Sequence, residues 1–108
     1  MRHYSTRART PELFEHIEYL RKTAQIPILD LSNLFGVSER TYHNWLQGAL
    51  PDQSYEPWMR KVSSLLEEEI KAGNLPAHGT PRSNRVIQAR NASMVSVQKK
   101  LIDWLMAL

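Results

Sequence analysis

The sequence predicts an all-α fold, a compact bundle of four to five helices. Apolar residues recur three and four positions apart in several segments, which is the period of one face of a helix. Residues that start helices precede these segments, and glycine ends two of them. Within residues 28–47, a tight turn centred on a glycine separates two short helical segments. We therefore expect helices joined by short connections.

The first of these short helices ends at a glycine. Leu31, Leu34 and Phe35 share one face of it. Gly36 follows directly, and a residue without a Cβ can take the left-handed conformation that ends a helix. We expect Ser38 to be the N-cap of the second helix, because its side-chain oxygen can accept hydrogen bonds from backbone N–H groups of the next turn.

The second short helix has one buried and one polar side. Tyr42 and Trp45 are expected to point inward, with Thr41 and Leu46 flanking them. Val37 is expected to point into the angle between the two helices, and Ser32 to allow their close approach. The opposite side carries polar residues, namely Glu39, Arg40, His43, Asn44 and Gln47.

This segment resembles the helix-turn-helix of Cro and lambda-repressor type regulators. The resemblance lies in Ser32, the turn Gly36-Val37-Ser38, Trp45 and Gly48. Ile28 stands where such proteins often carry Gln, and Leu46 where they often carry Glu. The resemblance implies a sequence-specific regulator whose second helix enters the major groove of double-stranded DNA. The alternative is an ordinary helical hairpin.

Two longer helices complete the predicted domain, residues 10–73. Thr10, Pro11 and Glu12 predict the start of a helix over 11–24, with Thr10 as N-cap. Another helix is expected over about 55–72, closed by Gly73. Its acidic run, residues 67–69, is expected to face solvent and to bind no metal.

The chain beyond residue 73 divides into a basic linker, 74–92, and a last helix, 93–108. Ser93 is expected to cap this helix. Its apolar residues follow a heptad spacing, and Ile102 widens the stripe. We expect this helix to pair with the same helix of a second chain through Met94, Val97, Leu101, Trp104, Leu105 and Leu108. The alternative is that the helix folds back onto its own domain.

Charge is unevenly distributed along a chain of net charge +3. Residues 28–53 hold one basic and three acidic side chains, so the short helices are slightly acidic. Contacts to the DNA backbone are therefore expected from outside them. The candidates are Arg2, Arg7 and Arg9 in a basic arm, residues 1–9, and Arg82, Arg85 and Arg90 near the linker.

The side-chain chemistry of the second helix suggests how it would read bases. Arg40 suits guanine through two donors, Asn44 suits adenine, and Glu39 can accept from cytosine. Ser38, Thr41 and His43 complete the expected set of base-reading residues. Gln47 is expected to contact the DNA backbone. One helix reads few base pairs, so we expect a homodimer on a roughly palindromic operator, with half-sites about one helical turn apart.

Composition narrows the function classes. The chain has no cysteine, which excludes disulfides and Cys-based zinc sites, and no apolar run of membrane-spanning length. No nucleophile, phosphate-loop or paired-histidine motif is present, so we expect neither an enzyme nor a cofactor or metal. The principal hypothesis is a cytoplasmic bacterial or phage regulator, such as a repressor. The alternative is an antitoxin-like or scaffold protein whose apolar C-terminal helix binds a protein partner.

Overall fold

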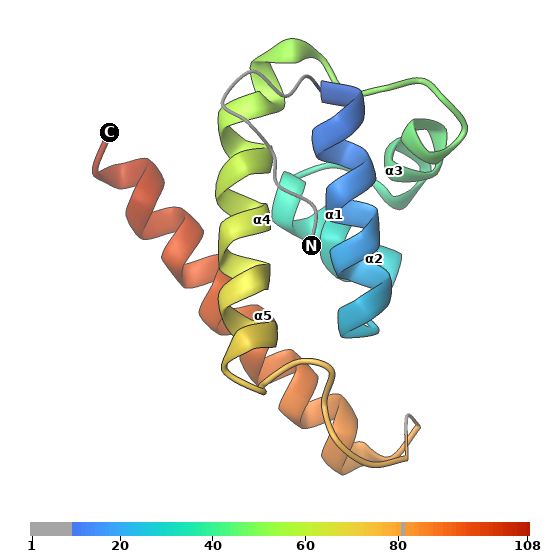
Figure 1. The fold of residues 1–108 in the computed structure, drawn as a ribbon, viewed down its shortest axis with the longest axis vertical. Helices are drawn as coiled ribbons and strands as arrows, with labels where there is room; N and C mark the ends of the chain where they lie inside the picture. Colours follow the sequence, from blue (N-terminus) through green and yellow to red (C-terminus); the bar gives the residue numbers. More distant parts are fainter. Residues whose placement is uncertain (1–9, 81) are drawn as a thin grey trace.

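The structure, a computed structural model, describes residues 10–80 and 82–108. This part of the chain forms helices and contains no strand, so the expected all-α class is confirmed. The helices surround one core (Figure 1). In chain order they are α1 (Thr10–Ala24), α2 (Ile28–Phe35), α3 (Glu39–Leu46), the short 3₁₀-helix η1 (Gln53–Tyr55), α4 (Glu56–Lys71) and α5 (Asn84–Met106).

α1 and α4 lie side by side and form the centre of the fold (Figure 1). Leu13, Ile17 and Leu20 on α1 are buried, as their helical spacing predicts. Burial of a side chain of this size stabilises the fold by roughly 1.5–3 kcal/mol. Thr10 already lies within α1, and its hydroxyl donates to Glu56 Oε1 at 3.1 Å. The start of α1 is therefore joined to the start of α4.

α4 also supports the short helix α2. The indole Nε1–H of Trp58 donates to the backbone oxygen of Leu34 at 2.8 Å. Met59, Val62 and Leu66 are buried along the same helix. The Trp58 hydrogen bond therefore joins the C-terminal end of α2 to α4.

The acidic run at the end of α4 does not lie wholly at the surface as expected. Glu69 is buried, and its carboxylate accepts from Asn74 Nδ2 at 3.1 Å. Its backbone oxygen also accepts from the N–H of Asn74 at 2.9 Å, which helps to close the helix. Glu67 is exposed and hydrogen-bonded to His16 Nε2 at 2.6 Å.

The last helix begins nine residues earlier than the sequence suggested. α5 starts at Asn84, and Ser83 caps it by accepting from the N–H of Val86 at 3.2 Å. Residues 84–92 include neither glycine nor proline, so nothing in them interrupts a helix. Ser93, expected to be the cap, is instead buried inside α5. The expected linker over 74–92 is therefore wrong, and the connection ends at residue 83.

α5 folds back onto its own chain. The exposed fractions of Met94, Val97 and Leu101 are 8%, 1% and 1%, because these side chains pack in the common core beside α4. Trp104 is half-buried and contacts Trp58, with ring centroids 5.8 Å apart. Four of the six expected dimerisation residues thus pack within the chain, and that pairing seam is wrong. The remaining two, Leu105 and Leu108, are exposed.

No helix in the described part of the chain is both long enough and apolar enough to cross a membrane.

Candidate nucleic-acid interface

The turn between α2 and α3 has the geometry that its sequence predicts. Gly36 has φ 67° and ψ 29°, a left-handed conformation that few residues other than glycine adopt. The N–H groups of Gly36 and Val37 bond to the oxygens of Asn33 and Ser32 at 3.1 and 3.0 Å, which satisfies the end of α2. Ser38 Oγ accepts from the N–H of Thr41 at 3.1 Å, so the predicted N-cap is confirmed.

The apolar side of α3 is held by aromatic packing. Tyr42 is fully buried and Trp45 nearly so. Phe35 meets the Trp45 ring edge to face, with centroids 5.7 Å apart, and the Phe14 ring lies 5.4 Å from that of Tyr42. Ser32 is also fully buried, and its hydroxyl donates to the oxygen of Leu29 at 2.7 Å. A small side chain here fits the expected close approach of the two helices.

A buried polar network also joins α3 to α1. The Tyr42 hydroxyl donates to Glu18 Oε2 at 2.6 Å. Arg21 donates to both oxygens of the same carboxylate, at 2.7 and 2.9 Å, and to the oxygen of Ile26 at 3.1 Å. Sequence patterns did not predict this network. Its only signal was an acid and a base three residues apart on a largely apolar helix.

The ionisation of this network is set by its surroundings. Burial by itself raises the pKa of Glu18, but hydrogen bonds from Arg21 and Tyr42 outweigh it, so the pKa lies below its ordinary value. Burial and the Glu18 carboxylate raise the pKa of Tyr42 far above its ordinary value. The hydroxyl therefore stays protonated and remains a donor.

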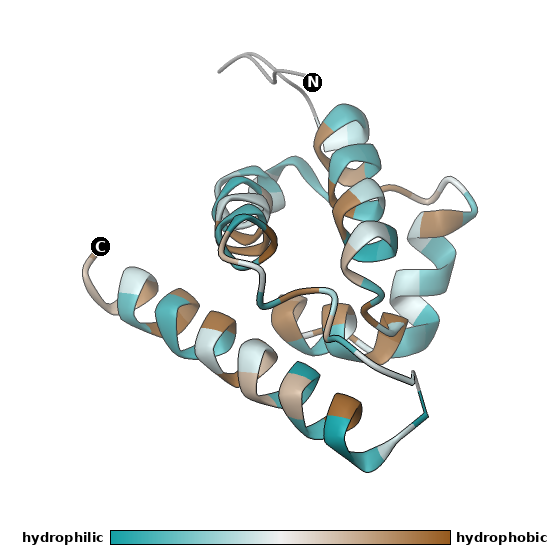
Figure 2. Cartoon of the chain, turned by 60° about the horizontal axis from the view of Figure 1, so that its bottom comes forward, coloured by the Kyte–Doolittle hydropathy of each residue, from teal (hydrophilic) through white to brown (hydrophobic). Residues whose placement is uncertain are grey.

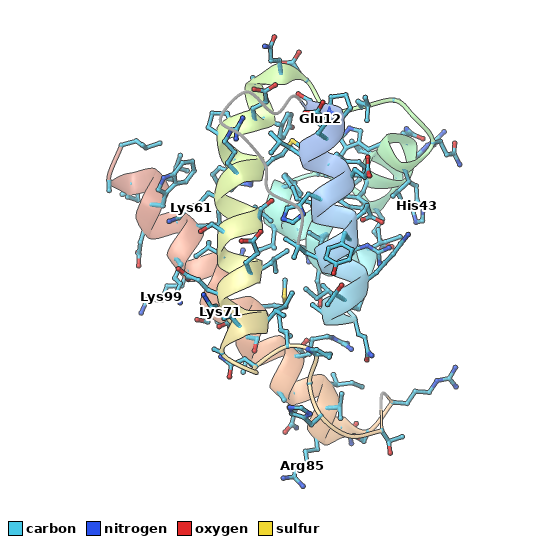
Figure 3. All side chains as sticks on the ribbon, in the orientation of Figure 1. Glu12, His43, Lys61, Lys71, Arg85 and Lys99 are labelled. Carbon is cyan, nitrogen blue, oxygen red and sulfur yellow. The ribbon has the colours of Figure 1, made fainter. Side chains whose placement is uncertain are left out.

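The opposite side of α3 is open. Five of the six expected base readers are exposed, and Thr41 is half-buried beside Ser38, whose hydroxyl donates to it at 3.1 Å. Figure 3 shows His43 projecting from α3 away from the other helices. Gln47, at the end of α3, is exposed as well. The structure thus brings the expected readers together on one helix surface. The exposed ones are Ser38, Glu39, Arg40, His43 and Asn44.

Two apolar side chains are exposed at the end of α3 and in the loop that follows it. Leu46, expected to flank the buried side of α3, has an exposed fraction of 39%, and Leu50 in the following loop is also exposed. Apolar side chains in a major groove can contact the thymine methyl group. Leu46 is more exposed than expected, and it is the last residue of α3.

The expected backbone contacts are more dispersed. Arg82 and Arg85 are exposed near the start of α5, and Figure 3 shows Arg85 well away from His43. Arg2, Arg7 and Arg9 lie outside the described residues. The described part contains all 11 acidic residues and all but these three of the 14 basic ones, so its formal net charge is zero.

Arg90, which we expected to contact the DNA backbone, instead forms an ion pair within the chain. Its Nε lies 3.8 Å from Asp30 Oδ2 on α2, and both groups are largely buried. Burial raises the pKa of Asp30, and Arg90 offsets only part of that rise. This ion pair connects α5 to α2, so Arg90 is not available at the surface.

The described side chains offer no metal site: histidine and acidic residues in this part form no cluster that could hold an ion.

Comparison of the chain with protein-family models, curated proteins and solved structures gave no match. The functional interpretation therefore depends on the residues themselves.

Proposed function

We propose that this protein is a sequence-specific, double-stranded DNA-binding regulator that inserts α3 into the major groove. The observation that carries the proposal is the contrast between the two sides of α3. One side is fixed by Tyr42 and Trp45, and the other presents exposed hydrogen-bonding groups. A rigid helix with an exposed polar face is what direct reading of base edges requires.

Each exposed side chain has a matching base chemistry. Arg40 would donate two hydrogen bonds to O6 and N7 of guanine, and Asn44 would pair with N6 and N7 of adenine. Glu39 would accept from the N4 amino group of cytosine. The correct bidentate pair contributes roughly 1–3 kcal/mol of discrimination against a wrong base.

Affinity for the phosphates has to come from other parts of the chain. Arg40 is the one basic side chain in residues 28–53, and Glu39 lies beside it. We assign phosphate contacts to Arg2, Arg7 and Arg9, with Arg82 and Arg85 as further candidates. A homodimer would double the readout on a roughly palindromic operator. Where such an operator overlaps a promoter, its occupation blocks transcription, so we propose repression, in the cytoplasm of a bacterium or of a phage host.

The proposal is tested by selection from a pool of random-sequence DNA duplexes. Wild-type protein is expected to enrich one short motif. Binding to that motif should weaken steeply between about 50 and 200 mM salt, while the preference over scrambled DNA persists. Failure to enrich any motif would contradict the proposal and favour the alternative, a scaffold that binds a protein partner.

A further inference from the structure

The outer face of α5 carries a second apolar stripe, distinct from the buried seam. Val95, Gln98, Ile102 and Leu105 are spaced three, four and three residues apart, and Met106 widens the stripe. The apolar members have exposed fractions of 64% (Val95), 51% (Ile102), 48% (Leu105) and 81% (Met106). Figure 2 shows hydrophobic segments along this half of the helix. No other described helix covers these side chains.

The position of the stripe leaves it accessible while α3 binds elsewhere. The C-terminal half of α5 lies across the molecule from α3 (Figure 1). The core is complete without a further partner, because Met94, Val97 and Leu101 are already buried. A partner that covers the stripe would therefore bind a chain that is already folded.

Charge at the edge of the stripe indicates which partner fits. Lys99 and Asp103 are both exposed and lie one helical turn apart on the same flank. A flank that carries one charge of each sign is complementary to itself when a two-fold axis reverses its direction. Two-fold interfaces between identical chains require such self-complementarity.

We propose that a second copy of this chain packs on this stripe, with the two α5 helices antiparallel and crossing near residue 100. In this register Val95 meets the partner's Leu105, and Gln98 meets the partner's Ile102. Lys99 faces the partner's Asp103, and the reverse pair forms by symmetry. A parallel pairing would instead set this flank against the apolar side that carries Met94 and Leu101, and it would form neither ion pair.

The size of the stripe sets the strength of the dimer. Standard interfaces bury about 800 Å² on each partner, and four apolar side chains with one amide between them supply less than that. We therefore expect a dissociation constant on the order of micromolar to tens of micromolar. The use of this dimer at an operator rests on the proposed function, whereas the pairing itself can be tested without DNA.

Analytical sedimentation of DNA-free protein between about 5 and 500 µM tests whether the stripe forms a dimer, because a dimer becomes more populated as the concentration rises. Wild type should shift from monomer to dimer, and Ile102→Glu should remain a monomer with an unchanged helical circular dichroism spectrum. Gln88→Glu is the matched control, since Gln88 is exposed on α5 outside the paired region. A wild-type monomer at every concentration, or a dimer that survives Ile102→Glu, would overturn the proposal.

Charge exchange tests the antiparallel register. Asp103→Lys should weaken the dimer by at least about tenfold, because two pairs of like charges then face each other. Adding Lys99→Asp to the same chain should restore pairing, since both ion pairs reform with opposite polarity. If the double variant pairs no better than Asp103→Lys alone, the antiparallel arrangement is wrong. A chain that dimerises as expected but enriches no DNA motif would contradict only the proposed function.

Discussion

Tyr42 on α3 donates a 2.6 Å hydrogen bond to Glu18 on α1, in the interior of the molecule. Arg21 donates to both oxygens of the same carboxylate. The orientation of α3 about its own axis is therefore set by a directional contact as well as by aromatic packing. This contact keeps the polar side of α3 facing outward, where the proposed readers are needed.

Tyr42→Phe tests the contribution of this contact to stability. The ring remains in place, but Glu18 loses a donor in a buried site, and a hydrogen bond to a charged group contributes roughly 1.5–3 kcal/mol. Urea denaturation should show a loss of that size. Tyr55→Phe is the matched control, because the Tyr55 hydroxyl makes no hydrogen bond to any described residue. An equal, small loss in both variants would contradict the role given to Tyr42.

The pH dependence of stability should report the Glu18 carboxylate. Its pKa is lower in the folded chain than its ordinary value of 4.5. The ionised group therefore stabilises the fold above that pH, and this contribution is lost as the pH falls through the folded pKa. The difference in unfolding free energy between wild type and Glu18→Gln should shrink from pH 7 to about pH 3. A constant difference would mean that the Glu18 charge contributes nothing.

Gly36 is required for its backbone conformation and not for lack of space. A Cβ added at Gly36 would meet no atom within 4 Å, but φ is +67°. Gly36→Ala should lower the free energy of unfolding by about 1 kcal/mol. This value is the strain of alanine in the left-handed conformation minus the stabilisation that results because alanine reduces the conformational entropy of the unfolded chain. Gly36→Asn should cost less, since asparagine adopts this conformation more readily. Equal losses in the two variants would show that the strain lies elsewhere.

Local patterns in the sequence predicted the turn between α2 and α3 and the cap of α3 correctly. Gly36 and Ser38 act over a few residues, so the turn and the cap could be foreseen. Contacts between distant segments could not, because nothing in the local spacing records that Tyr42 meets Glu18 or that Arg90 meets Asp30. The seam of α5 shows the same limit. Met94 and Val97 follow a spacing that fits pairing within the chain or between chains, and only the position of α4 decides between them.

The basic arm should determine how strongly DNA binding depends on salt. Replacing Arg2, Arg7 and Arg9 by alanine should reduce the slope of log K against log salt by about 0.9 for each phosphate that these arginines neutralise, while the preferred motif stays the same. Lys71→Ala is a suitable control, because Lys71 is exposed on the opposite side of the molecule from His43 (Figure 3). An unchanged slope would mean that other residues bind the phosphates.

The central claim, that α3 reads bases, is tested most directly by combining a protein change with every base change. Affinities of wild type and Arg40→Ala are measured for the selected motif and for each single base-pair variant of it. Arg40→Ala should lose discrimination of roughly 1–3 kcal/mol at one G·C pair and keep it at the other positions. A uniform loss at all positions, or no change at any, would contradict the assignment of α3 as the reading helix.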